Sequence, residues 1–386
     1  MIDLALKTIP FPLPVRIPTS ARSVRRCSQR SLARASLFFG VIALIALTVG
    51  LTAILEDVRP ELRDPEFGIR LQQLKEWQQK APGRPLVLAI GSSRMQFGLS
   101  PAAMGFSDEP SEPLVYNLGY QGALPNMAAL NLIRVLDAGI RPHCVLVEFV
   151  PRAFVKLGMM HGNTFTAYLR NWPNRFSLGD MRRMAELEES FGDDRTLAMR
   201  WMLGYATPWS TQRLVLTSRL LPDWLPEVKM IPVNVNAQPS DKYGFAPILT
   251  TTVTDEKRLS NIDAARNGFG RLAEELRNLG QIPSLSPMIG VLVRRCHAEG
   301  ILVAFVWIPE SAALQEGFPQ FQAIGEIYAA NLIRDYGAAL FPPPHLAEED
   351  FMDGFHLLPS SAQRYSRWLA DTHLKPWLIA HGLKKQ

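Results

Sequence analysis

LAIGSSRMQFGLSP, residues 88–101, is the segment from which the architecture of this chain is best inferred. It continues an apolar run that starts at Leu86, ends at Gly91 and is followed by two serines. A short apolar run bounded by glycine predicts a buried strand that runs into a turn. Backbone amides in such a turn, at the carboxyl edge of a parallel sheet, can stabilise negative charge. The segment therefore holds either a nucleophilic serine or a polar cap at the end of a strand.

Further apolar runs of strand length follow along the chain. They are LVYN at 114–117, HCVLVEFV at 143–150 and ILVAFVWIP at 301–309. Helical patterns lie between or after them, at 126–138, 287–298, 321–336 and 360–370. Strand, loop, helix and strand in this order predict an α/β protein with a parallel sheet and helices on its faces.

Residues 153–285 interrupt this alternation with amphipathic helical stretches and a proline-studded polar span from Leu221 to Leu259. We interpret them as a largely helical insertion or cap. Within it, NGFGRLAEE resembles a glycine-rich nucleotide loop, but no strand precedes it, so we expect no nucleotide site there. The expected division of the whole chain is a basic cytoplasmic tail at 1–34, a transmembrane helix at 35–55, a polar helical linker at 56–84, and one domain in two parts, 85–152 and 286–386, on either side of the insertion at 153–285.

The segment Ala35 to Leu55 is 21 residues without a charge. At about 1.5 Å per residue, a helix of this length spans a hydrocarbon core of roughly 30 Å. Seven basic residues and one acidic residue precede it, so we expect the N-terminus in the cytoplasm and the rest of the chain outside it. The alternatives are a cleaved signal peptide, for which VGLTAILED offers no clear A-x-A site, and a buried core helix.

The rest of the chain limits the classes of partner and cofactor. The formal charge of +5 comes from the N-terminal segment, and residues 56–386 are close to neutral, so nothing points to nucleic acid. Cys27, Cys144 and Cys296 are too few for a disulfide framework, and at most Cys144 and Cys296 can pair. We expect these two to be buried small apolar residues rather than reactive thiols. The spacing of the cysteines and histidines predicts no metal site, and we expect no cofactor.

A serine becomes a nucleophile when an imidazole reaches its hydroxyl and a carboxylate orients the imidazole. The sequence offers one outstanding pair, Asp353 and His356 in MDGFHLLPSS, just before the last predicted helix. Two residues between them on a turn let the carboxylate reach one ring nitrogen and leave the other facing outward. A helix cap for Asp353 and a surface position for His356 are the alternatives. The esterase motif G-x-S-x-G fails, because Met95 stands at its last position.

Three short motifs in order resemble the SGNH (GDSL-like) hydrolase superfamily, especially its membrane-anchored branch of envelope acyl-transfer and acetylation proteins. They are Gly91-Ser92-Ser93, NLGYQG ending at Gly122, and Asp353 to His356. The resemblance implies a three-layer, flavodoxin-like parallel sheet in which Ser93 is the nucleophile, His356 the base and Asp353 its orienting group. The backbone amides of Ser93 and Gly122 would form the oxyanion hole. Gly119 competes with Gly122, whose simpler interpretation is a turn glycine with positive φ.

One motif departs from that family. Where its third block carries an oxyanion-donating asparagine, this chain reads VLVEFVPRAF and places Arg152. Arg152 and Arg94 are further candidate donors, or ion-pair partners of Glu148. Loss of one oxyanion donor costs on the order of 100- to 1,000-fold in rate, so the departure bears directly on activity.

The resulting hypothesis is a single-pass, membrane-anchored serine esterase or O-acyltransferase. It would act on acyl, often acetyl, esters of an envelope or extracellular carbohydrate, and could work beside a multipass membrane acyltransferase. The alternative is a non-catalytic, membrane-tethered binding or assembly protein on the same scaffold. Four tryptophans of the insertion are candidates for stacking on sugar rings, or for packing: Trp172, Trp201, Trp209 and Trp224.

Overall fold

The computed structural model describes residues 20–123, 125–154, 175–187, 195–224, 240–278 and 285–383. The chain divides into two compact units, Met1–Leu51 and Thr52–Gln386. The first unit is described from Ser20 onward as a single helix. The second contains the sheet, the other helices and the candidate active site.

Helix α1 (Ser20–Ala53) carries the apolar segment and runs into the π-helical turn η1 (Ile54–Val58). The part from Gln29 to Val58 is long and apolar enough to cross a membrane, and none of its most apolar stretch is buried against the protein. A core helix would be largely buried, so this exposure favours the other two interpretations. Length and composition fit a membrane span or a signal sequence.

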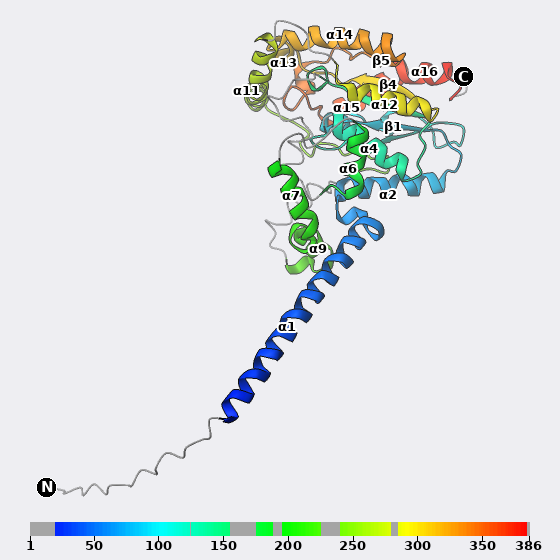
Figure 1. The fold of residues 1–386 in the computed structure, drawn as a ribbon. Helices are drawn as coiled ribbons and strands as arrows, with labels where there is room; N and C mark the ends of the chain where they lie inside the picture. Colours follow the sequence, from blue (N-terminus) through cyan, green and yellow to red (C-terminus); the bar gives the residue numbers. More distant parts are fainter. Residues whose placement is uncertain are drawn as a thin grey trace, which may run out of the picture. The chain divides into compact units, whose positions relative to one another are not determined.

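The sheet has five parallel strands in the order β2-β1-β3-β4-β5 (Figure 1). This is a flavodoxin-like order, and it confirms the predicted fold class. Four strands agree with the predicted apolar runs, but the short last one, which precedes a proline-rich segment, was not predicted. The strands are β1 (Leu86–Ile90), β2 (Leu114–Asn117), β3 (Cys144–Phe149), β4 (Leu302–Trp307) and β5 (Ala339–Phe341).

Alternate side chains of each strand enter two separate hydrophobic cores. Leu88 and Ile90 of β1 join the core beneath α2, α4, α12 and α14. Val87 and Ala89 join the core beneath α3, α15 and α16. Since the period of a strand is two residues, helices cover both faces and the domain has three layers. The helices around these cores are α2 (Pro65–Lys80), α3 (Ser93–Gly98), α4 (Pro125–Asp137), α12 (Pro287–Ala298), α13 (Ala312–Glu316), α14 (Pro319–Tyr336), α15 (Pro359–Leu369) and α16 (Lys375–Ala380), with a π turn η8 (Ala370–Leu374) and the 3-10 turns η2 (Pro60–Leu62), η3 (Pro101–Met104), η4 (Pro151–Ala153) and η7 (Glu348–Asp350).

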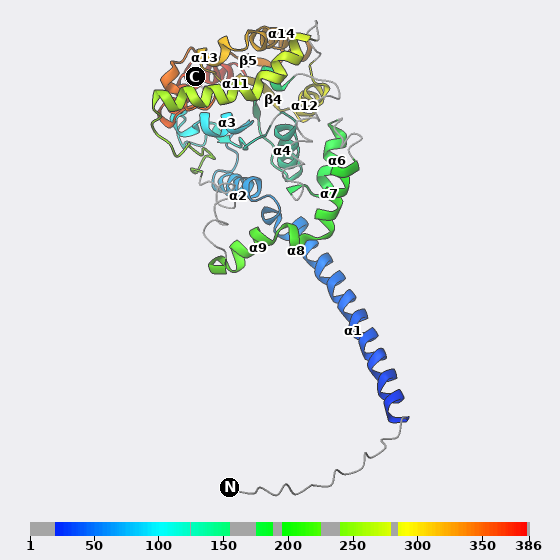
Figure 2. The ribbon, with the colours of Figure 1, turned by 90° about the vertical axis from the view of Figure 1, so that its left-hand side faces the viewer.

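Most of the described residues of the expected insertion, 153–285, are helical, as predicted. They form α6 (Leu178–Glu186), α7 (Arg195–Ala206), α8 (Pro208–Thr211), α9 (Arg213–Leu220), the 3-10 turn η6 (Pro222–Trp224) and α11 (Asp255–Asn278). Helix α11 begins inside the span that we expected to be irregular, and it lies beside α13 and α14 (Figures 1 and 2). NGFGRLAEE is part of α11, so it is no nucleotide loop.

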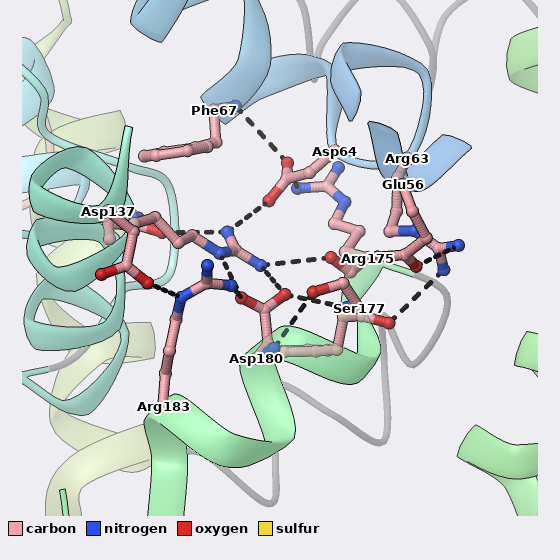
Figure 3. Close-up of polar contacts among 12 residues, drawn as sticks. Glu56, Arg63, Asp64, Phe67, Asp137, Arg175, Ser177, Asp180 and Arg183 are labelled. Carbon is pink, nitrogen blue, oxygen red and sulfur yellow. Dashed lines mark hydrogen bonds and ion pairs between the residues drawn. The ribbon is translucent and has the colours of Figure 1, made fainter. Parts of the chain in front are cut away.

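A buried cluster of charged side chains joins α2, α4 and α6 (Figure 3). Arg134 of α4 donates to both carboxylate oxygens of Asp180, at 2.9 and 2.7 Å, and lies 3.1 Å from Asp64. Burial would raise the pKa of Asp180, but the Arg134 guanidinium outweighs it and lowers that pKa to about 2. Asp180 also completes a capping box with Ser177. The cluster therefore fixes α6, the first helix in the described part of the insertion, to the sheet domain.

The cysteines follow the sequence-based expectation. Cys144 lies in β3 and Cys296 in α12, and both are buried and unpaired. Burial raises the pKa of the Cys296 thiol to about 12, so it stays protonated and unreactive.

Candidate active site

Ser93 lies at the carboxyl end of β1, in the first turn of α3. Gly91, two residues earlier, lies where the backbone after β1 comes close to side chains of β3 and α3. A Cβ at Gly91 would lie 2.5 Å from Cβ of Glu148 and 2.8 Å from Cβ of Met95. Only glycine fits there, which explains why glycine stands at the start of this turn. The turn presents the Ser93 side chain at the edge where parallel sheets bind ligands.

The structure brings Ser93, His356 and Asp353 together. Oγ of Ser93 lies 2.7 Å from Nε2 of His356, and Nδ1 of the same ring lies 2.7 Å from Oδ2 of Asp353. Ser93 and His356 are 263 positions apart in the chain. This is the arrangement in which a base takes the serine proton while a carboxylate fixes its tautomer and orientation.

Backbone hydrogen bonds hold the Asp353 carboxylate in position to orient the His356 ring. Its Oδ1 accepts the backbone N–H groups of His356, at 2.8 Å, and Phe355, at 3.2 Å. Burial favours the neutral carboxyl, but the hydrogen bonds from the His356 ring and from these amides outweigh burial and lower the pKa of Asp353. The group is therefore an anion at neutral pH.

The loop that carries His356 is held by contacts that sequence patterns did not predict. Within the loop, Met352 N–H donates to the His356 carbonyl at 2.9 Å. From α11, Arg258 Nε donates to the Phe351 carbonyl at 3.2 Å and Asn261 Nδ2 to the Met352 carbonyl at 3.1 Å. The insertion thus takes part in positioning the candidate base.

Two backbone amides remain available for an oxyanion. Among the described residues, no acceptor takes the N–H of Ser93 or of Gly122. Tyr120 N–H donates to the Gly91 carbonyl at 2.9 Å, so the loop that leads to Gly122 runs beside the serine turn. Gly122 has φ of 68°, which favours glycine. Gly119 is the weaker candidate, because its N–H donates to Oδ1 of Asn117 at 2.8 Å.

Ser92, the neighbour of the candidate nucleophile, has a structural role. Its hydroxyl donates to Oε1 of Glu148 at 3.0 Å and caps α3 by accepting from Arg94 N–H at 3.2 Å. Its own N–H donates to Oε2 of Glu148. Glu148, at the end of β3, therefore fixes the turn that carries Ser93. Nothing in the sequence pattern distinguished this glutamate from other residues of a buried strand.

Neither arginine proposed for the oxyanion hole is a free donor. Arg94 is buried, donates to the Ile308 carbonyl at 2.6 Å, and lies 2.9 Å from Glu310 and 3.8 Å from Glu148. Arg152 pairs with Glu310, and its guanidinium lies over the ring of Phe269, 4.4 Å from the centroid. The expected partnership with Glu148 therefore holds for Arg94 but not for Arg152. A cavity of about 20 Å³, enough for one water molecule, adjoins Arg152, Phe269 and Trp307.

Aromatic rings flank the candidate base. The rings of Phe355 and Phe97 lie 4.3 and 5.6 Å from the His356 ring, between centroids. Of the tryptophans considered for sugar stacking, Trp201 is buried and donates to the Phe176 carbonyl at 3.2 Å, so it serves packing. Trp209 is half-buried, Trp224 is 76 % exposed, and Trp172 lies outside the described residues.

No protein-family model matches the chain, and no curated protein matches it with significant sequence similarity.

Among the described residues, no group of three or more His, Cys, Asp or Glu side chains is placed to hold a metal ion.

Proposed function

We propose that the protein is a membrane-anchored serine esterase or O-acyltransferase that acts on acyl esters, acetyl esters among them, of an envelope or extracellular carbohydrate. The observation that carries this proposal is the Ser93–His356–Asp353 geometry, with both hydrogen-bond distances at 2.7 Å. A scaffold without catalysis has no need to hold a serine hydroxyl, an imidazole and a partly buried carboxylate in line. The substrate class rests on the resemblance of three motifs to SGNH hydrolases.

In the proposed reaction, Oγ of Ser93 attacks the acyl carbonyl carbon while Nε2 of His356 takes the hydroxyl proton. The negative oxygen of the tetrahedral intermediate accepts hydrogen bonds from the amides of Ser93 and Gly122. When the ester bond breaks, the imidazolium returns its proton to the departing alkoxide, and the acyl group stays on Ser93. Water or a sugar hydroxyl then attacks the acyl-enzyme while His356 takes its proton. As the bond between the acyl carbon and Oγ breaks, the imidazolium returns that proton to Ser93.

Two further parts of the proposal concern the membrane. The apolar helix would remain as an uncleaved anchor, with its basic flank in the cytoplasm and the sheet domain on the opposite side. A transferase of this kind needs an activated acyl donor on its own side of the membrane, and a multipass membrane acyltransferase could supply it. The apolar helix and the seven basic residues before it support the anchor and its orientation.

The test is labelling of the full-length chain with a fluorophosphonate probe, which reacts with activated serines. We expect labelling of the wild type and loss of labelling in Ser93→Ala and His356→Ala. Ser360→Ala is the control, because Ser360 is exposed in the first turn of α15 and its substitution removes a serine hydroxyl that takes no part in the proposed site. A folded wild type that does not react, or a reaction that survives Ser93→Ala, would contradict the proposal.

A further inference from the structure

Exposed apolar side chains gather in one part of the insertion, from α7 to η6. Among the described residues after Val58, eleven large apolar side chains are exposed, and six of them lie within residues 199–224. Scattered exposed apolar residues are ordinary, whereas six of them on one run of successive, mutually contacting helices indicate an interaction surface. The α7–η6 surface is defined by six exposed side chains: Met199, Met202, Leu203, Leu220, Leu221 and Trp224.

The opposite side of α7 is fixed to the domain. Trp201 is buried, and the ring of Tyr205 lies beneath the guanidinium of Arg63, 5.2 Å from its centroid. Positions 199, 202 and 203 are three or four residues apart, so they share the helix face that these contacts leave open. The exposure is therefore a property of a packed amphipathic helix.

This surface adjoins the place where the chain enters the second unit. Arg63, which contacts Tyr205, also pairs with Glu56 at 2.7 Å. Glu56 lies within the last turn of the apolar segment Gln29–Val58, where Ile54 and Val58 are themselves 40 and 66 % exposed. Figure 2 shows α8 and α9 on the side of this unit where residues 54–62 enter it. If the apolar helix crosses a membrane, α7 is tied to residues next to the membrane surface.

The chemistry of the segment fits lipid headgroups. Residues 195–224 carry four arginines and one acid, Asp223, alongside the apolar residues and Trp224. Basic residues next to apolar and aromatic ones are typical of helices that lie in the membrane interface. Arginines there are attracted to anionic lipid.

We propose that the α7–η6 surface lies in the headgroup region of the membrane that carries the apolar helix. The domain would then contact the bilayer at two places, its anchor and this surface, and would be held in one orientation. The proposal rests on the uncleaved anchor of the proposed function and is independent of the chemistry of Ser93. Lipid is the occupant favoured by the tether, the positive charge and the aromatic residue together.

The test places a fluorescent reporter on this surface in the full-length chain. With Cys27→Ser, the remaining native cysteines are buried, so Met202→Cys or Leu220→Cys can be labelled with NBD. Ile333→Cys is the matched control, because Ile333 of α14 is 53 % exposed and Met202 is 55 % exposed. The protein is reconstituted at one copy per nanodisc, with zwitterionic and anionic lipids that carry nitroxide either near the headgroup or deep in the acyl chain.

We expect a loss of NBD emission at residues 202 and 220, stronger with the shallow nitroxide, because an interfacial helix enters the bilayer by about 5–10 Å. The label at residue 333 should not be quenched. Emission at 202 and 220 that equals the control would overturn the proposal. So would labels that are shielded from aqueous iodide yet unaffected by nitroxide lipids, since protein would then cover the surface. A mature chain that lacks the apolar helix would remove the tether, whereas fluorophosphonate labelling of Ser93 would be unaffected.

Discussion

At the scale of the residue, the group that contacts Nδ1 of His356 determines whether Nε2 carries a proton. A carboxylate at Nδ1 keeps the ring proton there and leaves Nε2 free to accept one from Ser93. An amide at position 353 can donate to Nδ1 and thereby place the ring proton on Nε2, which then cannot accept the Ser93 proton. We expect Asp353→Asn to slow fluorophosphonate labelling by about 10⁴-fold. The thermal unfolding midpoint should change little, because the two side chains have nearly the same shape. A labelling rate close to that of the wild type would show that Asp353 is only a loop cap.

Glu66 gives a prediction about pH. Its carboxylate is buried and accepts Gln121 N–H at 3.0 Å. Burial raises its pKa from 4.5 to about 7, although Arg175 and Arg70 oppose the shift. Between these two values the folded state binds a proton that the unfolded chain has released. The contribution of Glu66 to the free energy of unfolding therefore falls as the pH rises through this window.

Glu66→Gln removes this titration and keeps an acceptor for Gln121 N–H. We expect the unfolding midpoint of the wild type, relative to the Gln variant, to decrease between about pH 5 and pH 8. Thermal unfolding of both proteins across that range measures the difference. A difference that stays constant, or that grows with pH, would contradict the raised pKa.

Single residues of the site were predictable to different degrees. Local motifs identified Ser93, Asp353 and His356, because the turns that present them have recognisable glycines and spacing. Gly122 and Gly119 could be separated only by seeing where each N–H points. The pairing of Arg152 with Glu310 joins residues 158 positions apart, and no local pattern carries that information.

At the scale of the element, α11 holds the loop of the candidate base. Arg258→Ala would leave the Phe351 carbonyl without its guanidinium donor. Small displacements of a catalytic group cost about 100-fold in rate, so we expect slower labelling of Ser93 with a modest loss of stability. Arg277→Ala, in the last turn of the same helix, is the control. Equal labelling rates in the two variants would mean that the loop holds itself in place.

The buried cluster of charged side chains between α4 and α6 is expected to affect the stability of the domain and not the reaction at Ser93. Asp180→Asn would leave Arg134 buried with one fewer counterion and would weaken the capping box of α6. Breaking a buried ion pair in this way costs about 3–5 kcal/mol. Denaturant unfolding should show that loss, while the folded variant still labels at Ser93. Arg182→Ala removes an exposed pair on the same helix and should be nearly neutral.

The elements that the sequence predicted well are those whose burial determines their composition. Strands β1 to β4 are buried and therefore apolar. Helix α11 is rich in charged residues and contains Gly268 and Gly270. A Cβ at either glycine would meet open space, so packing does not require glycine there. The position of α11 depends on its contacts with the His356 loop, which are tertiary interactions that local sequence does not encode.

At the scale of the whole molecule, the boundary between the apolar helix and the folded unit lies earlier than the composition indicated. The sequence places the end of the transmembrane helix at residue 55, yet the second unit begins at Thr52. Leu55 is 1 % exposed, and Glu56 pairs with Arg63, whose side chain is 7 % exposed. These residues are apolar or charged like their neighbours, so only packing shows that they belong to the domain.

A truncated chain should therefore be stable when it starts at Thr52 and weakened when it starts at Val58. The shorter chain loses the burial of Leu55, which contributes about 1.5–3 kcal/mol, and leaves the buried Arg63 guanidinium without Glu56. Thermal unfolding of the two chains, and of Leu55→Ala in the longer one, measures the effect. Leu55→Ala should account for part of the difference, with the unpaired arginine supplying the rest. Equal midpoints would mean that the domain is independent of the turn that follows the apolar helix.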